Sequence, residues 1–191
     1  MRLSILSFMC ACCFFTASCA HVIPPAKQVS WVVIPSSTTI KIPQLAKIHI
    51  AVGPVSIPTY LNRSDLFIRD AESSASFNDS YLWVERLDDA IARVLSENLA
   101  SELESKKMSV SPASFQLPAS KRIFINIERF DGKMNSLLIL SATWGVVNPQ
   151  GDILKIGHYS ASENVGASVL DLVASHGTAL EKFAKYLAQQ M

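Results

Sequence analysis

The chain has 191 residues, of which 49% are hydrophobic and 17% charged, and its formal net charge is +1. This composition supports one ordinary domain with a packed core and excludes a chain that is disordered over most of its length. The near-zero charge argues against nucleic-acid binding and against attraction to anionic lipid headgroups, since both need a strongly basic surface.

The N-terminus has the pattern of an export signal. Arg2 precedes an apolar stretch from Leu3 to Phe15, which is too short to cross a bilayer and is typical of a signal peptide. Small residues then lead up to Cys19, as in the site that lipoprotein signal peptidase cleaves. We therefore predict lipidation of Cys19; an ordinary signal peptide or a short membrane anchor is the alternative. Ala20 follows the cysteine, and the absence of Asp at that position favours sorting to the outer membrane.

The distribution of cysteines supports this interpretation. All four lie in the first 19 residues: Cys10, Cys12, Cys13 and Cys19. Disulfides and thiolate zinc sites are therefore excluded from the body of the chain. The predicted organisation is a lipoprotein signal peptide at 1–18, a lipidated tether at 19–30 and a periplasmic domain at 31–191.

The first half of the domain is predicted to hold two strands, a long loop and a helix. An apolar run and an alternating segment predict the strands, a Pro-marked polar stretch predicts the loop, and apolar residues at three-and-four spacing predict the helix. The two strands are expected at Trp31–Ile34 and Lys47–Val52, and the helix at Trp83–Lys106. The loop is expected at Gly53–Tyr81, with a short strand at Leu66–Arg69.

The second half is predicted to form a meander followed by a helix. After a loop bounded by Pro112 and Pro118, three alternating segments are separated by turn residues. The strands and the helix are expected at Lys121–Phe130, Leu137–Val147, Ile153–Ser162 and Ser168–Ala188. The predicted fold class is α+β, with a single mixed, largely antiparallel sheet of about five strands and two helices packed on one face.

The sequence offers no support for catalysis. It has no Gly-x-Ser-x-Gly elbow and no glycine-rich phosphate loop, and the adjacent carboxylates Asp88 and Asp89 diverge on a helix. The chain has four histidines, and no two of them have the spacing of a metal-ligand pair: His21, His49, His158 and His176. His176 lies on the apolar stripe of the last predicted helix and is expected to be packed. We predict a non-enzymatic protein without metal or cofactor.

Four motifs carry a family resemblance when taken together in this order. They are Val52–Val55 with Pro58–Arg63, Leu82–Leu87, Ile127–Gly132, and Leu140–Trp144. Over about 31–188 the sequence resembles the ABC-type transport auxiliary lipoproteins, the PqiC/YmbA-like family. Asn62, Leu82 and Arg86 depart from the usual family residues.

The resemblance implies an accessory lipoprotein of an MCE-type intermembrane lipid transport system. Such a protein would dock the periplasm-spanning MCE-domain component at the outer membrane. The residues expected to contact this partner are Tyr60, Leu61, Arg63 and Trp83, because Tyr, Trp and Arg are common interface anchors. The alternatives are that these side chains serve packing, and that the protein is a structural or adaptor lipoprotein of the envelope. Assembly into a homo-oligomer is left open by the sequence.

Overall fold

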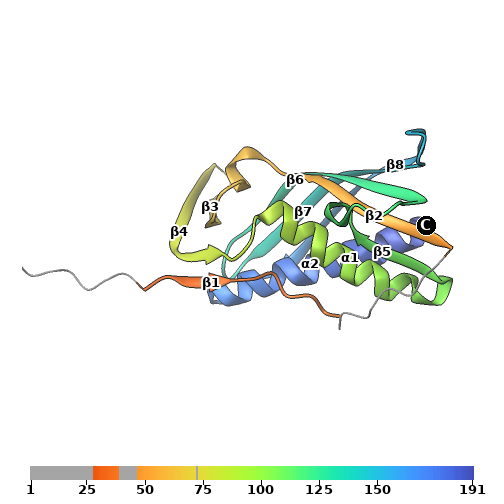
Figure 1. The fold of residues 1–191 in the computed structure, drawn as a ribbon. Coiled ribbons are helices and arrows are strands. Elements are labelled where there is room, and N and C mark those ends of the chain that lie inside the picture. Colours follow the sequence, from red (N-terminus) through yellow and green to blue (C-terminus); the bar gives the residue numbers. More distant parts are fainter. Residues whose placement is uncertain (1–27, 39–46, 72) are drawn as a thin grey trace, which may run out of the picture.

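The structure is a computed structural model that describes residues 28–38, 47–71 and 73–191. The predicted signal peptide, Cys19 and His21 lie outside the described residues. The elements follow one another as β1 (Ser30–Val32), β2 (Ile48–Ser56), η1 (Thr59–Leu61), β3 (Asp65–Ala71), β4 (Ser74–Trp83), α1 (Leu87–Leu103), η2 (Glu104–Lys106), β5 (Met108–Pro112), η3 (Ala113–Phe115), β6 (Lys121–Gly132), β7 (Leu137–Val147), β8 (Ile153–Asn164) and α2 (Val169–Gln190) (Figure 1).

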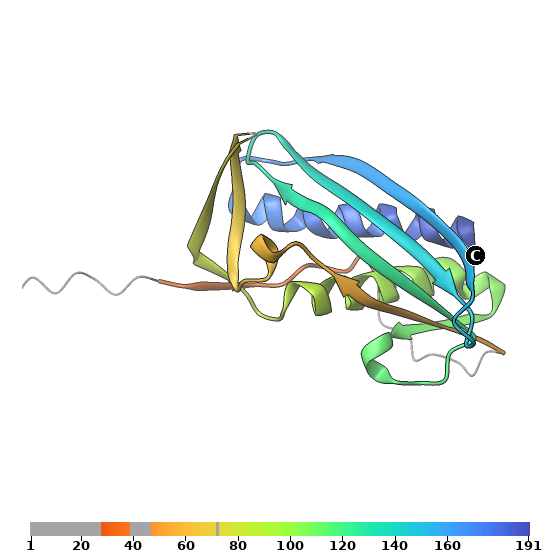
Figure 2. The ribbon, with the colours of Figure 1, turned by 90° about the horizontal axis from the view of Figure 1, so that it is seen from above.

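The larger sheet has five strands in the order β5-β2-β6-β7-β8. Strand β2 is parallel to both of its neighbours, and β6, β7 and β8 form the predicted antiparallel meander. Both helices cover one face of this sheet, and the views in Figures 1 and 2 show its other face uncovered. Alternate residues of β6, such as Ile123, Ile125 and Ile127, are buried against the helices, so the period-two pattern of the sequence decides which face forms the core.

The prediction of a single sheet is wrong, because β1, β4 and β3 form a second, three-stranded sheet. Strand β1 is three residues long and pairs in parallel with the end of β4. The segment 53–81, expected to be a loop, contains the end of β2, η1 and most of a β3–β4 hairpin (65–83). Many side chains of β3 and β4 are exposed or only partly buried, so the alternation of apolar and polar residues that marks a strand is weak in this segment.

Two further boundaries differ from the prediction. Strand β5, the parallel edge neighbour of β2, was not predicted, because it has only five residues and ends at Pro112, where the predicted loop begins. Helix α1 begins at Leu87 rather than at Trp83, so Trp83 ends β4 and Val84 precedes the helix. Helix α2 begins close to its predicted start, where Ser168 and Asp171 form a capping box.

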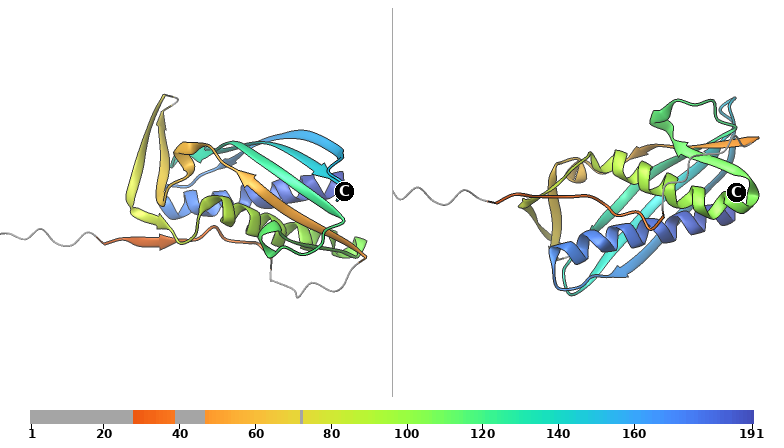
Figure 3. Two further views of the ribbon diagram at one scale, coloured as in Figure 1. Left: turned by 45° about the horizontal axis from the view of Figure 1, so that its top comes forward. Right: turned by 60° about the horizontal axis from the view of Figure 1, so that its bottom comes forward.

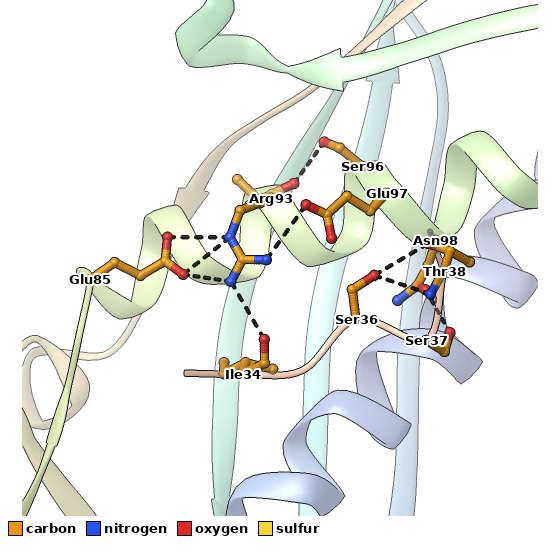
Figure 4. A network of polar contacts seen from close by, with 10 residues as sticks. Ile34, Ser36, Ser37, Thr38, Glu85, Arg93, Ser96, Glu97 and Asn98 are labelled. Atoms are coloured by element: carbon orange, nitrogen blue, oxygen red, sulfur yellow. Dashed lines mark hydrogen bonds and ion pairs between the residues drawn. The ribbon is translucent and has the colours of Figure 1, made fainter. Parts of the chain in front are cut away.

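An N-terminal strap, residues 30–38, runs from β1 along the seam between the two helices (Figure 3). Within the strap, Ile34 is buried in the core, and Ser37 Oγ donates a hydrogen bond to Asn98 Oδ1 of α1 at 2.8 Å. Arg93 donates to the carbonyl of Ile34 at 3.4 Å and pairs with Glu85 (Figure 4). The segment that connects the domain to its predicted tether is therefore fixed to the core.

Candidate functional site

A buried carboxylate joins the β3–β4 hairpin to the larger sheet. Asp131, at the end of β6, has no exposed surface. Its Oδ1 accepts hydrogen bonds from Arg69 Nε at 2.6 Å and from Arg129 Nε at 3.1 Å. Its Oδ2 accepts from Arg69 Nη2 at 3.0 Å and from Tyr60 Oη at 2.8 Å. Tyr60 in η1 and Arg69 in β3 thus bind the main sheet through one side chain. We call Asp131 and its three partners, Tyr60, Arg69 and Arg129, the Asp131 cluster.

Charge and hydrogen bonding keep this carboxylate ionised. Burial alone would raise the pKa of Asp131, but hydrogen bonds from Arg69 and Tyr60, together with the charges of Arg129 and Arg69, hold that pKa below its usual value. Burial and the bond to Asp131 raise the pKa of Tyr60 to about 12, so the phenol remains a donor at every physiological pH. The cluster is a fixed ion pair with a neutral phenol, which suits a structural joint.

A row of aromatic rings leads from this cluster to the surface of the hairpin. The ring centroids of Tyr60 and Phe67 are 4.7 Å apart, and those of Phe67 and Phe77 are 5.5 Å apart. The Arg63 guanidinium lies 4.4 Å above the Phe77 ring and also pairs with Asp65 at 2.9 Å. The exposed end of this row, Arg63 and Phe77, is a rigid cationic and aromatic surface, which we call the hairpin surface.

The structure places the four predicted contact residues in different environments. Arg63 is exposed and Tyr60 is half-buried, with its hydroxyl directed to Asp131. Leu61 and Trp83 are both buried in the core. They support the hairpin surface from within rather than forming its outer face.

Trp83 is part of a second buried group that includes the expected packed histidine. The His176 ring lies edge-on to Trp83 at 5.6 Å and to Phe130 at 4.5 Å, and its Nδ1 donates to the carbonyl of Leu172 at 2.8 Å. Burial lowers the pKa of His176 to about 4, so the ring is neutral at pH 7. His176 is therefore a packed histidine, as the apolar stripe of the helix predicted.

A shallow groove of about 310 Å³ lies beside the hairpin surface. Its lining includes Arg63, Trp31 and Val84. Sequence reasoning did not single out Trp31, Phe77 or Val84. Trp31 fell in the predicted apolar strand Trp31–Ile34, Val84 in the predicted helix Trp83–Lys106 and Phe77 in the predicted loop Gly53–Tyr81, so their exposure became visible only with the fold.

The uncovered face of the larger sheet carries one polar cluster that superficially resembles a catalytic triad. Glu128 accepts hydrogen bonds from Thr143 at 2.6 Å and from Ser141 at 2.7 Å, and these bonds lower the pKa of Glu128 to about 2. However, Glu128 Oε2 and Ser141 Oγ both lie 3.1 Å from the same nitrogen of His158, Nε2. A triad requires acid and nucleophile on opposite ring nitrogens, so this arrangement does not activate the serine.

The described part of the chain contains neither a candidate metal site nor a candidate membrane-spanning helix. Within residues 28–38, 47–71 and 73–191, no group of three or more acidic, histidine or cysteine side chains could hold a metal ion. Among the helices described, none is long and apolar enough to span a membrane.

The chain is similar to known proteins in both sequence pattern and fold. The profile of a family described as "ABC-type transport auxiliary lipoprotein component" matches residues 33–188. A crystal structure titled only as an uncharacterized protein has a TM-score of 0.72 at 16% identity, covering 85% of this chain and 98% of its own. Protein XCC0632 from Xanthomonas campestris has a TM-score of 0.62 at 11% identity, covering 84% of this chain and 92% of its own. At these identities the structures support the fold alone. A comparison with curated proteins gives no match.

Proposed function

Because the chain belongs to the family of ABC-type transport auxiliary lipoprotein components, we propose that it is a non-enzymatic accessory subunit of an MCE-type intermembrane lipid transport system. In this proposal an acylated Cys19 anchors the domain, and the domain docks the periplasm-spanning MCE component at the outer membrane. The proposed role is positional: the anchor fixes the distance from the membrane, and a rigid surface binds the partner.

The observation that supports a docking role is the construction of the hairpin surface. Phe77 projects from β4 and Arg63 from the segment that leads into β3, and both belong to a small sheet in which β1 pairs with only three residues of β4. A hairpin with so little support is at best marginally stable by itself. The Asp131 cluster fixes this hairpin to the main sheet through Arg69 and Tyr60. Fixed aromatic and arginine side chains lose little conformational entropy on binding, which is the property of an interface anchor.

We place the MCE contact on this surface. Arg63 and Phe77 would touch the partner directly, Tyr60 would contribute its accessible ring edge, and the buried Leu61 and Trp83 would hold the surface in position. Favourable contact would come from stacking and from the forked guanidinium rather than from overall charge, which is close to zero.

The test is co-purification of the chain with the MCE-domain protein of the same genome from detergent-solubilised membranes. We expect the double variant Arg63→Ala, Phe77→Ala to lose at least tenfold in affinity, since a pair of interface anchors contributes about 2 kcal/mol or more. The matched control is Arg122→Ala, Phe124→Ala, which removes an exposed arginine and a partly exposed phenylalanine from the start of β6.

The outcomes separate the two candidate functions. A folded double variant that binds as tightly as the wild type would move the interface away from the hairpin surface. A wild-type chain that retains its membrane anchor but recovers no MCE protein would favour the structural or adaptor role instead.

A further inference from the structure

An exposed apolar strip lies where the described chain begins. Three alternate residues and one residue of the β4–α1 connection form it, and their exposed fractions are Val29 43%, Trp31 63%, Val33 49% and Val84 59%. From Trp31 onward exposure alternates: Val32 and Ile34 are buried, so the extended chain directs these side chains into the core and those of Trp31 and Val33 into solvent. We call these four residues the tether strip.

The backbone that carries the tether strip is fixed. Ser30, Trp31 and Val32 pair with consecutive residues of β4, and the amide of Val84 donates to the carbonyl of Val32 at 3.0 Å. Trp31 and Val84 both line the groove beside the hairpin surface. The strip is therefore a pre-formed apolar surface rather than a set of side chains on a loose end.

The covalent chain keeps this strip near the lipid anchor. Ten residue steps separate Cys19 from Val29, so the two cannot be more than about 36 Å apart in any conformation. This is about the length of α2, whose 22 residues span roughly 33 Å at 1.5 Å per residue. The bilayer is thus present at high effective concentration, and even weak affinity suffices for contact.

We propose that the tether strip rests in the interfacial layer of the membrane that holds the acylated Cys19, with the Trp31 ring at headgroup depth. This inference depends on the lipidation at Cys19 that forms part of the proposed function. Tryptophan is the side chain most typical of the membrane–water interface, and the flanking valines add apolar area that can enter the boundary of the acyl chains.

The charges beside the strip identify the kind of lipid surface that fits. Arg63 pairs with Asp65, Arg86 pairs with Asp88 and Asp89, and Glu85 pairs with Arg93. These groups comprise three positive and four negative charges, so the small surplus is negative and nothing in this neighbourhood draws the strip to anionic lipids. The contact is therefore with zwitterionic headgroups and is insensitive to salt.

The chain contains its own probe for this contact. It has three tryptophans, and Trp83 and Trp144 are buried while Trp31 is exposed. We would reconstitute the full acylated protein into phosphatidylcholine vesicles, isolate it by flotation, and measure quenching of Trp31 by aqueous acrylamide and by phospholipids brominated on their acyl chains. The Trp31→Phe variant supplies the background from the two buried rings.

We expect Trp31 in vesicles to be quenched by the brominated lipid and to lose most of its acrylamide quenching, with an emission shift to shorter wavelength. The result should be the same at low and high salt. The matched control is Trp31→Phe, Ile156→Trp, which moves the probe to an exposed position near the start of β8. The connection that leads into β8 lies at the end of the domain away from β1 (Figures 1 and 2). That probe should remain open to acrylamide and unaffected by bromine.

Each contrary result has a separate meaning. Protein that does not float with the vesicles contradicts anchoring at Cys19, and with it the premise of this proposal. Protein that floats while Trp31 remains open to acrylamide overturns the membrane contact alone and leaves the anchor intact. Shielding of Trp31 that requires added MCE-domain protein would assign the strip to a protein partner and also overturn the proposal.

Discussion

Arg69 of β3 and Asp131 of β6 form a two-pronged ion pair across the junction between the two sheets, with Nε to Oδ1 at 2.6 Å and Nη2 to Oδ2 at 3.0 Å. The pair joins a small, partly covered sheet to the core of the domain. The stability of the hairpin surface therefore depends on a contact between two residues that are 62 positions apart in the sequence.

The first prediction concerns this pair. Arg69→Met removes the main partner of a fully buried carboxylate, and breaking such a pair costs about 2–3 kcal/mol here because Arg129 and Tyr60 remain bonded to Asp131. We expect a fall of that size in the free energy of unfolding measured with urea. The matched control is Arg63→Met, whose ion pair with Asp65 is exposed and should contribute under about 1 kcal/mol. Equal losses in both variants would contradict a special role for the buried pair.

The second prediction concerns acid. The folded state lowers the pKa of His176 from 6.5 to about 4, so between these values the unfolded chain binds the extra proton. Stability is therefore complete above about pH 6.5 and declines as the pH falls toward 4, by about 3 kcal/mol at 1.36 kcal/mol per pKa unit. Between pH 7 and pH 5 the expected part of this loss is about 2 kcal/mol, which urea unfolding at the two pH values measures. His176→Leu should remove most of the difference between the two pH values, and an unchanged difference would exclude His176 as its source.

Asp131 adds a separate loss at lower pH. Its folded pKa lies below the ordinary value, so its contribution is present above about pH 4 and disappears as the pH falls through the folded value. Acid should therefore loosen the hairpin after the His176 contribution has been lost. Tryptophan emission compared with far-UV circular dichroism below pH 4 would separate this local change from global unfolding.

The third prediction concerns the N-terminal strap. A Cβ added at Gly177 of α2 would lie 2.6 Å from the carbonyl oxygen of Pro35, so Gly177→Ala must displace the strap. We expect lower thermal stability and faster proteolytic cleavage within the strap. The matched control is Gly145→Ala in β7, where the nearest atom would be at an ordinary 3.7 Å. Strap cleavage at the wild-type rate in Gly177→Ala would show that the contact is easily accommodated.

The fourth prediction concerns the anchor. Cys19→Ala should abolish labelling of the chain by radioactive fatty acid and remove it from the mature membrane-bound pool. Cys13→Ala, which alters the nearest other cysteine in the N-terminal segment, should be labelled as the wild type is. Labelling that persists in Cys19→Ala would place the modification elsewhere. Separation of the two membranes on a density gradient tests outer-membrane sorting, which predicts little protein in the inner-membrane fraction.

Elements with a strong hydrophobic period could be predicted from the sequence. The meander β6–β8 and helix α2 lie close to their predicted positions because each alternates, or repeats at three-and-four spacing, over ten residues or more. Strand β5 was missed because five residues ending in Pro112 carry too little pattern. The second sheet was missed because β3 and β4 are half covered, so their side chains do not separate cleanly into apolar and polar faces.

The candidate site was predicted only in outline. The motif at 58–63 drew attention to the region of the candidate site, but sequence alone could not show that Leu61 and Trp83 face inward while Arg63 faces outward. Val84 was assigned to the buried stripe of a helix that actually begins three residues later, at Leu87. Asp131 looked like a turn residue beside Gly132, and only the fold shows that Arg69 and Tyr60 converge on it.

The parallel pairing of β1 with β4 also determines how the domain bears mechanical load. With the proposed anchor at Cys19, a pull from the membrane would act along β1. The hydrogen bonds of its three paired residues would then be loaded together rather than one after another. Behind them, the buried Ile34 and the bond from Ser37 to Asn98 resist the same displacement. In the proposed function, the strap therefore distributes tension between a partner and the membrane over β4 and α1 before it reaches the main sheet.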